Sequence, residues 1–316
     1  MIKTITSEAN AIVKLAKRLR GKRGRDKEGA FLIEGRNLLA EARKSGARVT
    51  HIFLREGSPL CEDADALRSG GVSDAFYAFS REINAPIRAE NEVDAEMIAL
   101  STGLFDAIAD TVTPQDVMAI VRKPVAGRYF GTDDSKDGAS GCFDDAGARP
   151  GDESRARSAL GSNGRIALAV LDRIQDPGNA GNIIRSAEAA DFTGVIAVKG
   201  TTDLFSQKAV RAAAGAIFRI PIHFAPDDET VLRLLKSLGV RCVACSMGGE
   251  RAYDRATLSG DAAIIVGNEG NGLSETFFNG ADERARIPMK EGSESLNVSV
   301  AAALMMFEKK RQEEVC

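Results

Sequence analysis

The chain has 316 residues, of which 44% are hydrophobic, so it is long enough for two domains with a core each. No apolar run approaches the roughly 20 residues of a membrane-spanning helix, and the N-terminus lacks the apolar core of a signal peptide, so we expect a cytoplasmic protein. The net charge of −3 does not exclude a nucleic-acid partner, because the sign of the charge changes along the chain.

The first predicted element is an amphipathic helix from Glu8 to about Arg20, ended by the glycine-containing stretch 21–25. Basic residues crowd the span 14–27, where Asp26 is the only acid, and a phosphate backbone would meet a positive field there. We predict an RNA-binding surface of Lys14, Lys17, Arg18, Arg20, Lys22, Arg23 and Arg25. The alternative is a basic helix face that is only solvated.

A small α/β domain follows this helix. Apolar runs predict strands at 30–33, at 49–54 and within 114–122, and a helix at 35–45 separates the first two strands. Strands that alternate with helices in this way predict a βαβ arrangement.

Small and acidic residues dominate the segment between 131 and 164, which has almost no large apolar side chain. Such a segment buries too little surface to offset the entropy of ordering it. We therefore predict three parts: a first α/β domain at 1–126, a flexible acidic linker at 127–163 and a second α/β domain at 164–316.

The second domain has continuous apolar runs, which are typical of strands buried on both faces. Its predicted strands lie at 165–171, 194–198, 219–224, 240–245, 262–266 and 284–287. Its predicted helices lie at about 180–191, 206–215, 227–238 and 297–312. This pattern predicts a doubly wound parallel sheet.

Three loops of this domain carry polar and glycine residues next to buried strands or helix starts. They are Asp176–Arg185, Val266–Leu273 and Ile287–Ala301. Glycines allow a ligand to approach the backbone, and the start of a helix favours an anion. Each loop alone also fits a simpler explanation, a glycine turn or an ordinary Ser or Asn helix cap.

The order and spacing of the three loops resemble the SpoU (TrmH-type) branch of the SPOUT family, which methylates RNA ribose 2′-hydroxyls from S-adenosylmethionine. The segment 33–42 is similar to the ribosomal-protein-like (L30e-type) substrate-binding domain that often precedes that catalytic domain, which implies that residues 1–126 bind the RNA substrate. The resemblance implies a deep trefoil knot in the C-terminal domain and an active site completed across a homodimer. It implies S-adenosylmethionine as cofactor, S-adenosylhomocysteine as product, and no metal.

The resemblance also assigns residues. It implies catalytic roles for Arg185, Asn179, Ser295 and Asn297, and a cofactor site of Gly267, Glu269, Ile287 and Leu296. We expect Glu269 to brace the loop or cofactor site rather than to transfer protons. A guanidinium has a pKa above about 12 and is a poor base. Arg185 therefore either orients a phosphate and stabilises the developing alkoxide or accepts the proton after a rare deprotonation.

Other reactive side chains point to structural roles. Cys242 and Cys245 lie three apart in a run rich in strand-forming residues, which favours strand thiols over a redox or metal site. His51 and His223 are the only histidines, and neither adjoins a Ser, Cys or carboxylate motif. A histidine-based mechanism is therefore poorly supported.

We predict methylation of a ribose 2′-oxygen in structured RNA, with 23S-type ribosomal RNA favoured over transfer RNA because of the N-terminal domain. Rival predictions within the same chemistry are a transfer RNA enzyme, a base-nitrogen methyltransferase and an antibiotic-resistance enzyme. A non-catalytic RNA-binding assembly protein is the rival of another class. A generic nucleotide-binding protein is disfavoured, because no P-loop or Rossmann fingerprint occurs.

Overall fold

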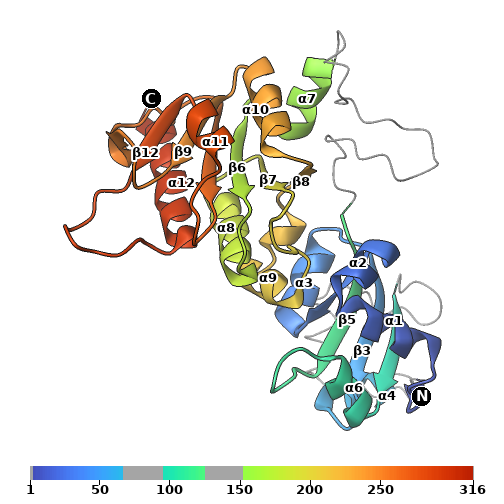
Figure 1. Cartoon of the computed structure of the whole chain (residues 1–316). Helices are drawn as coiled ribbons and strands as arrows, with labels where there is room; N and C mark the ends of the chain where they lie inside the picture. Colours follow the sequence, from blue (N-terminus) through green and yellow to red (C-terminus); the bar gives the residue numbers. More distant parts are fainter. Residues whose placement is uncertain (1–2, 67–94, 125–151, 316) are drawn as a thin grey trace. The chain divides into compact units, whose positions relative to one another are not determined.

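A computed structural model describes residues 3–66, 95–124 and 152–315 of the chain (Figure 1). The chain divides into two compact units. The N-terminal unit is Met1–Pro124 with Phe205–Phe218, and the C-terminal unit is Val125–Leu204 with Arg219–Cys316. Among the described residues, no helix is long and apolar enough to cross a membrane.

The N-terminal unit is built on a five-stranded mixed sheet. Its elements are β1 (Thr4–Ile5), α1 (Ala11–Leu19), α2 (Lys22–Glu28), β2 (Ala30–Glu34), α3 (Arg36–Lys44), β3 (Val49–Arg55), α4 (Pro59–Ala66), β4 (Glu96–Leu100), α6 (Thr102–Ile108) and β5 (Val117–Arg122). The strand order is β1-β4-β3-β5-β2, and β5 runs antiparallel to both β2 and β3. Strands β2 and β3 therefore run parallel and are joined by α3, as the predicted βαβ arrangement requires, and β5 lies between them in the sheet.

The structure has a second helix, α2, where the sequence predicted a loop after Arg20. Asn10 caps α1, whose residues Val13, Ala16 and Leu19 are fully buried in the core of the unit. The stretch from Lys22 to Glu28 forms α2 instead of a loop. A Cβ atom on Gly24 would lie 2.0 Å from the backbone oxygen of Arg18, so this glycine lets the two helices meet.

The C-terminal unit contains a seven-stranded parallel sheet. Its elements are α7 (Asp152–Leu160), β6 (Ala167–Asp172), α8 (Pro177–Ala189), β7 (Gly194–Val198), β8 (Ile222–Ala225), α10 (Asp228–Ser237), β9 (Arg241–Cys245), β10 (Arg251–Ala252), a 3-10 turn (Tyr253–Arg255), β11 (Ala262–Gly267), α11 (Glu275–Gly280), β12 (Glu283–Arg286) and α12 (Val298–Val315). Helix α9 (Gln207–Ala213) and the 3-10 turn Ala216–Phe218 cluster with the N-terminal unit. The strand order is β10-β12-β9-β11-β6-β7-β8, and every pair is parallel. The predicted parallel sheet is confirmed.

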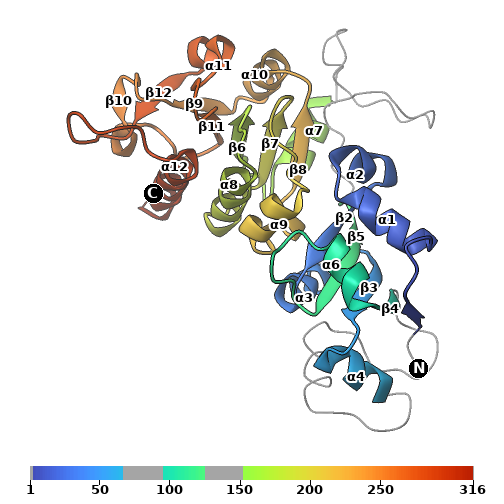
Figure 2. The same cartoon turned by 60° about the horizontal axis from the view of Figure 1, so that its bottom comes forward.

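Helices cover both faces of this sheet (Figure 2). One face packs against α8 and α12, and the other carries α7, α10 and α11 around a fully buried core. Strands β6 and β11 are neighbours in the sheet. Because parallel strands end at the same edge, the loops that follow β6 and β11 lie side by side.

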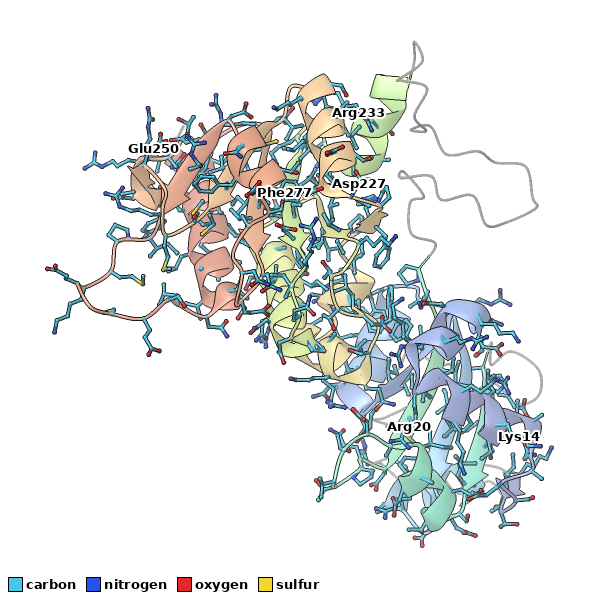
Figure 3. The ribbon with its side chains drawn as sticks, in the orientation of Figure 1. Lys14, Arg20, Asp227, Arg233, Glu250 and Phe277 are labelled. Atoms are coloured by element: carbon cyan, nitrogen blue, oxygen red, sulfur yellow. The ribbon has the colours of Figure 1, made fainter. Side chains whose placement is uncertain are left out.

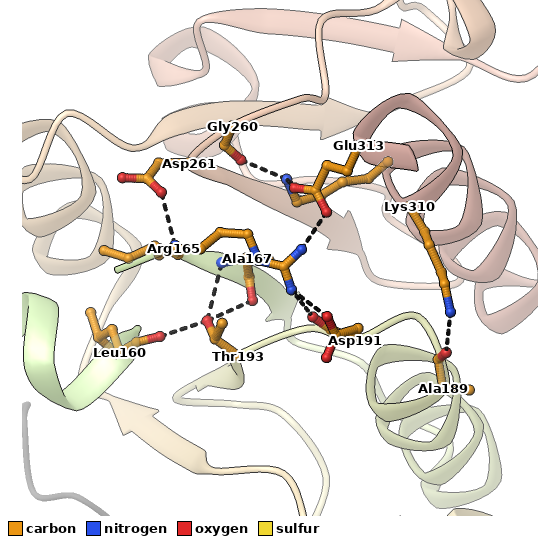
Figure 4. Close-up of polar contacts among 12 residues, drawn as sticks. Leu160, Arg165, Ala167, Ala189, Asp191, Thr193, Gly260, Asp261, Lys310 and Glu313 are labelled. Atoms are coloured by element: carbon orange, nitrogen blue, oxygen red, sulfur yellow. Dashed lines mark hydrogen bonds and ion pairs between the residues drawn. The ribbon is translucent and has the colours of Figure 1, made fainter. Parts of the chain in front are cut away.

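Helix α7 shows that the predicted linker does not extend to residue 163. Ala156 and Leu160 are fully buried in the core of the C-terminal unit, so a few small apolar residues are enough to dock this helix. Thr193 donates its hydroxyl to the carbonyl of Leu160 at 2.6 Å, and Asp261 accepts the amide of Ile166 at 2.8 Å (Figure 4). Residues 127–151 of the predicted linker lie outside the described residues.

Candidate active site

A cavity of about 560 Å³ lies at the carboxyl edge of the parallel sheet. Its walls come from the end of β9 and from the loops after β11 and β12. The lining residues are Cys245, Ser246, Met247, Gly248, Val266, Gly267, Asn268, Glu269, Gly270, Gly272, Leu273, Ile287, Met289, Ser295, Leu296, Asn297, Val298 and Ala301. All four residues predicted for the cofactor line this one cavity, together with Ser295 and Asn297.

The glycine at the end of β11 is required by the loop itself. A Cβ atom on Gly267 would lie 2.4 Å from the carbonyl carbon of Gly272, and Gly272 has a φ of 70°. The loop therefore folds back onto the strand end, where a side chain does not fit. The sequence predicted close approach of a ligand at this loop, and the structure shows close approach of the loop's own backbone.

Glu269 joins the loop after β11 to the start of α8. Its carboxylate accepts the amides of Gln175 at 3.0 Å and Asp176 at 3.2 Å, and the side-chain amide of Asn179 at 3.0 Å. Burial acts to raise the pKa of Glu269, but the hydrogen bonds from Asn179 and the backbone outweigh it and lower the pKa below its ordinary value. The carboxylate is therefore ionised at neutral pH.

Asn179 and Asn297 continue this connection to the third predicted loop. The side-chain amide of Asn297 donates to the side-chain oxygen of Asn179 at 2.9 Å. The other side-chain atom of Asn297, Oδ1, accepts the amide of Ser299 at 2.8 Å and so caps α12. Asn297 is thus both a helix cap and a link, and the chain Glu269–Asn179–Asn297 joins all three predicted loops.

Arg185 lies apart from these residues. It is an exposed residue of α8, and no hydrogen bond or ion pair joins its side chain to another described residue. It lines a second cavity of about 630 Å³, together with Asn182, Ser186, Tyr253, Ser299, Val300, Ala303, Leu304, Phe307 and Glu308. Within one chain, the structure does not bring Arg185 into the cavity of the other predicted residues.

The second cavity adjoins an apolar face of α12 that is open to solvent. Val300, Leu304 and Phe307 are 47%, 36% and 48% exposed, whereas Met305 and Met306 on the opposite side of the helix are fully buried. One side of α12 therefore packs into the core, and the other side faces solvent.

Sequence reasoning missed several lining residues. Cys245 was predicted to be a structural strand thiol, yet it lines the first cavity at the end of β9. Burial raises the pKa of Cys245 to about 11 and that of Cys242 to about 12, so both thiols stay protonated at neutral pH. The strand pattern could have indicated this position, because β9 is a parallel strand and its carboxyl end must lie at the same edge of the sheet as that of β11.

The predicted RNA-binding surface is only partly available. Lys14, Arg18, Arg20, Lys22 and Arg23 are exposed, and Figure 3 labels Lys14 on α1 and Arg20 directly after it. Three of the predicted residues form ion pairs within the unit: Lys17 with Glu8, Arg18 with Glu28 and Lys22 with Asp26.

Arg25 is a correction to the predicted surface. Its side chain is buried, and its guanidinium donates to the carbonyls of Leu19 at 2.7 Å and Arg20 at 2.6 Å. These are carbonyls at the end of α1, which lack partners within the helix. Arg25 therefore caps a helix and does not face RNA.

Comparisons with known proteins bear on the whole chain. A model of the SpoU rRNA Methylase family matches residues 167–307, and a model of the MRM3-like substrate binding domain matches residues 10–119. The chain is 29% identical over 306 residues to the 23S rRNA (guanosine(2553)-2′-O)-methyltransferase RlmP of Bacillus subtilis, an alignment that spans 97% of this chain and 98% of that protein.

Solved structures of RNA methyltransferases also match the chain over nearly its whole length. The AdoMet-bound rRNA methyltransferase of Sinorhizobium meliloti matches with a TM-score of 0.71 and 28% identity over 98% of both chains. An RNA 2′-O ribose methyltransferase matches with a TM-score of 0.67 and 26% identity, also over 98% of both chains.

The parallel sheet, the cavity between its glycine-rich loops and these matches define an S-adenosylmethionine-dependent RNA methyltransferase. The N-terminal unit carries its substrate-binding domain. Residues 167–307, which hold all three loops, belong to the SpoU rRNA methylase family, and this confirms the resemblance seen in the loops.

Proposed function

We propose that this protein methylates a ribose 2′-hydroxyl of 23S ribosomal RNA in the cytoplasm. The observation that carries the proposal is one cavity lined by the loops after β9, β11 and β12, which Glu269, Asn179 and Asn297 tie to the start of α8. The likeness to RlmP over nearly the whole chain supports a ribosomal RNA substrate. No observation favours the transfer RNA, base-nitrogen or non-catalytic alternatives over this reaction.

The first cavity fits S-adenosylmethionine. Its volume lies within the range of pockets for small ligands, and its walls combine loop backbone with apolar side chains. Ile287 and Leu296 would pack against the cofactor, and the loop from Gly267 would contact it through backbone groups. The bound cofactor supplies a methyl group that its sulfonium already makes electrophilic.

The chain itself must then align the ribose and manage one proton. Ser295 and Asn297 line the cavity beside the loop 268–274, called the cofactor loop below, where they would hold the 2′-hydroxyl. Asn297 is held in place through Asn179 and Glu269. Arg185 would contact the phosphate next to the target ribose and stabilise the developing alkoxide, since a guanidinium makes two parallel hydrogen bonds to phosphate oxygens.

A homodimer reconciles this role with the position of Arg185. One chain places Arg185 in the second cavity, beside the exposed apolar face of α12. If two copies pair through this face, Arg185 of one protomer can complete the first cavity of its partner. The trefoil knot implied by the resemblance stays a prediction.

The substitution Arg185→Ala tests the proposed chemistry. We expect methylation to be lost and the affinity for S-adenosylmethionine to stay nearly unchanged, because the proposed contact of Arg185 is with the RNA phosphate and not with the cofactor. Arg185→Lys keeps the charge but loses the paired hydrogen bonds, so it should restore little activity. Methyl transfer to RNA and calorimetric titration of the cofactor measure both effects. Full activity of Arg185→Ala would refute the assignment.

A further inference from the structure

The residue after β6 has an unusual backbone conformation. Arg173 has a φ of 57°, a left-handed conformation that is costly for any residue with a Cβ atom. Such strain persists only where the surrounding structure holds it. Two ion pairs hold Arg173: its guanidinium pairs with Asp172, and with Asp228 at the start of α10 at 3.0 Å.

This conformation directs the backbone carbonyl of Arg173 to the cofactor loop. The carbonyl accepts the side-chain amide of Asn268 at 2.9 Å. The side-chain oxygen of Asn268 accepts the amides of Gly270 and Asn271, both at 2.9 Å. The carbonyl of Arg173 therefore fixes the side chain that shapes the loop wall of the first cavity.

Asp172 holds the other end of the same loop. Its carboxylate is 1% exposed and accepts the amide of Ser274 at 2.7 Å. Burial raises the pKa of Asp172, and the Ser274 amide and the Arg173 guanidinium act against that rise. Without the guanidinium, a buried carboxylate would lose its cationic partner.

We propose that Asp172 and Arg173 form a positioning pair that fixes the shape of the cofactor loop 268–274 from outside the cavity. Neither residue is among those that line the first cavity, so the pair acts through Asn268 and Ser274. The loop shape then decides how well the cofactor is held. This inference rests on the proposed function, because it takes the first cavity as the S-adenosylmethionine site.

Two substitutions of one residue separate backbone positioning from charge. Arg173→Ala loses the ion pairs and still carries a Cβ atom, so the left-handed conformation is no longer held. Arg173→Gly also loses the ion pairs, but glycine adopts that conformation freely. We expect the dissociation constant for S-adenosylmethionine to rise about tenfold in the alanine variant, the cost of one unsupported left-handed residue, and less in the glycine variant.

Kinetics and a matched control complete the experiment. Because Arg173 touches no reacting group, kcat at saturating cofactor should stay within about twofold of wild type while KM for the cofactor follows the dissociation constant. Arg157 is the control, since it also pairs with an aspartate and its side chain is 43% exposed against 40% for Arg173. Arg157→Ala should leave the dissociation constant unchanged. Thermal unfolding without cofactor reports whether each variant folds.

The outcomes are distinct. Affinity that falls in the order wild type, Arg173→Gly, Arg173→Ala, with folded variants, supports the proposal. Equal losses in both variants would indicate that the charge of Arg173 matters and its backbone does not, and would overturn it, as would wild-type affinity in both. If the wild-type protein itself binds no S-adenosylmethionine in calorimetric titration, the proposed function fails first.

Discussion

At the scale of single residues, Glu269 connects two loops of the candidate site. Its carboxylate bridges the cofactor loop to the start of α8 through two backbone amides and Asn179. A carboxylate held by several donors stabilises the fold only while it is ionised. Glu269 therefore makes the stability of the site depend on pH.

We predict the pH range of this effect from the sign of the shift. Burial acts to raise the pKa of Glu269, but the hydrogen bonds lower it overall below the ordinary value of 4.5. The stabilisation is then complete above about pH 4.5 and is lost as pH falls through the folded-state pKa. Glu269→Gln should lower the free energy of unfolding by roughly 1 kcal/mol at pH 7, a modest value because the side chain is exposed.

Denaturant unfolding of wild type and Glu269→Gln between pH 3.5 and 7 checks this prediction. The difference between their free energies of unfolding should be constant near neutral pH and should shrink in acid. A difference that grows as pH falls would contradict the assignment of the bridge to an ionised carboxylate.

The sequence predicts which loops meet at the cavity but not the position of Arg185. Gly267, Glu269, Ser295 and Asn297 meet at one cavity because parallel strands share a carboxyl edge, which the strand pattern predicts. Arg185 does not join them. Arg185 lies six positions after Asn179 in α8, which corresponds to a rise of about 9 Å along the helix axis. Closeness in sequence therefore does not place both side chains in one cavity.

At the scale of elements, α1 and α2 form a corner that depends on one glycine. We predict that Gly24→Ala destabilises the N-terminal unit by roughly 1–3 kcal/mol, because its Cβ atom would overlap the backbone of Arg18 at 2.0 Å. Gly103 in α6 is the matched control, since a Cβ atom there meets no neighbour within 4 Å. Gly103→Ala should be neutral or stabilise by about 0.5–1 kcal/mol.

Thermal unfolding of both variants and of wild type measures this prediction. Equal stability of the two glycine variants would contradict the role given to Gly24.

Elements that the sequence missed have a common physical cause. Gly21 and Gly24 indicated a break, yet Gly21 only separates two helices and Gly24 allows them to pack. The acidic segment before residue 164 indicated disorder, yet Ala156 and Leu160 are enough to dock α7 on a large core. In both cases tertiary packing overrides local propensity, which a single sequence does not display.

At the scale of the whole molecule, the central structural expectation is a homodimer through α12. Leu304→Asp would place a charge in the middle of the exposed apolar face, where burial against a second copy becomes unfavourable. We predict that the Leu304→Asp variant is a monomer without methylation activity. Its melting temperature should be close to that of wild-type protein diluted to the monomer. Val315→Asp, 75% exposed at the end of the same helix, should remain dimeric and active.

Sedimentation equilibrium and methyl transfer test this prediction together. Mixing two inactive variants, Arg185→Ala and Asn297→Ala, should restore activity, because a mixed dimer contains one intact site. A monomeric wild-type protein with full activity, or a mixture that stays inactive, would refute an active site shared between protomers.

The reaction proposed for this protein is methyl transfer to a ribose of 23S ribosomal RNA. The most direct test incubates the purified protein with labelled S-adenosylmethionine and with unmodified 23S ribosomal RNA or transfer RNA, and maps the label by mass spectrometry. We predict label on one ribose 2′-oxygen of the ribosomal RNA, and none with Arg185→Ala. Label on a base nitrogen, label only on transfer RNA, or no transfer despite bound cofactor would contradict the claim.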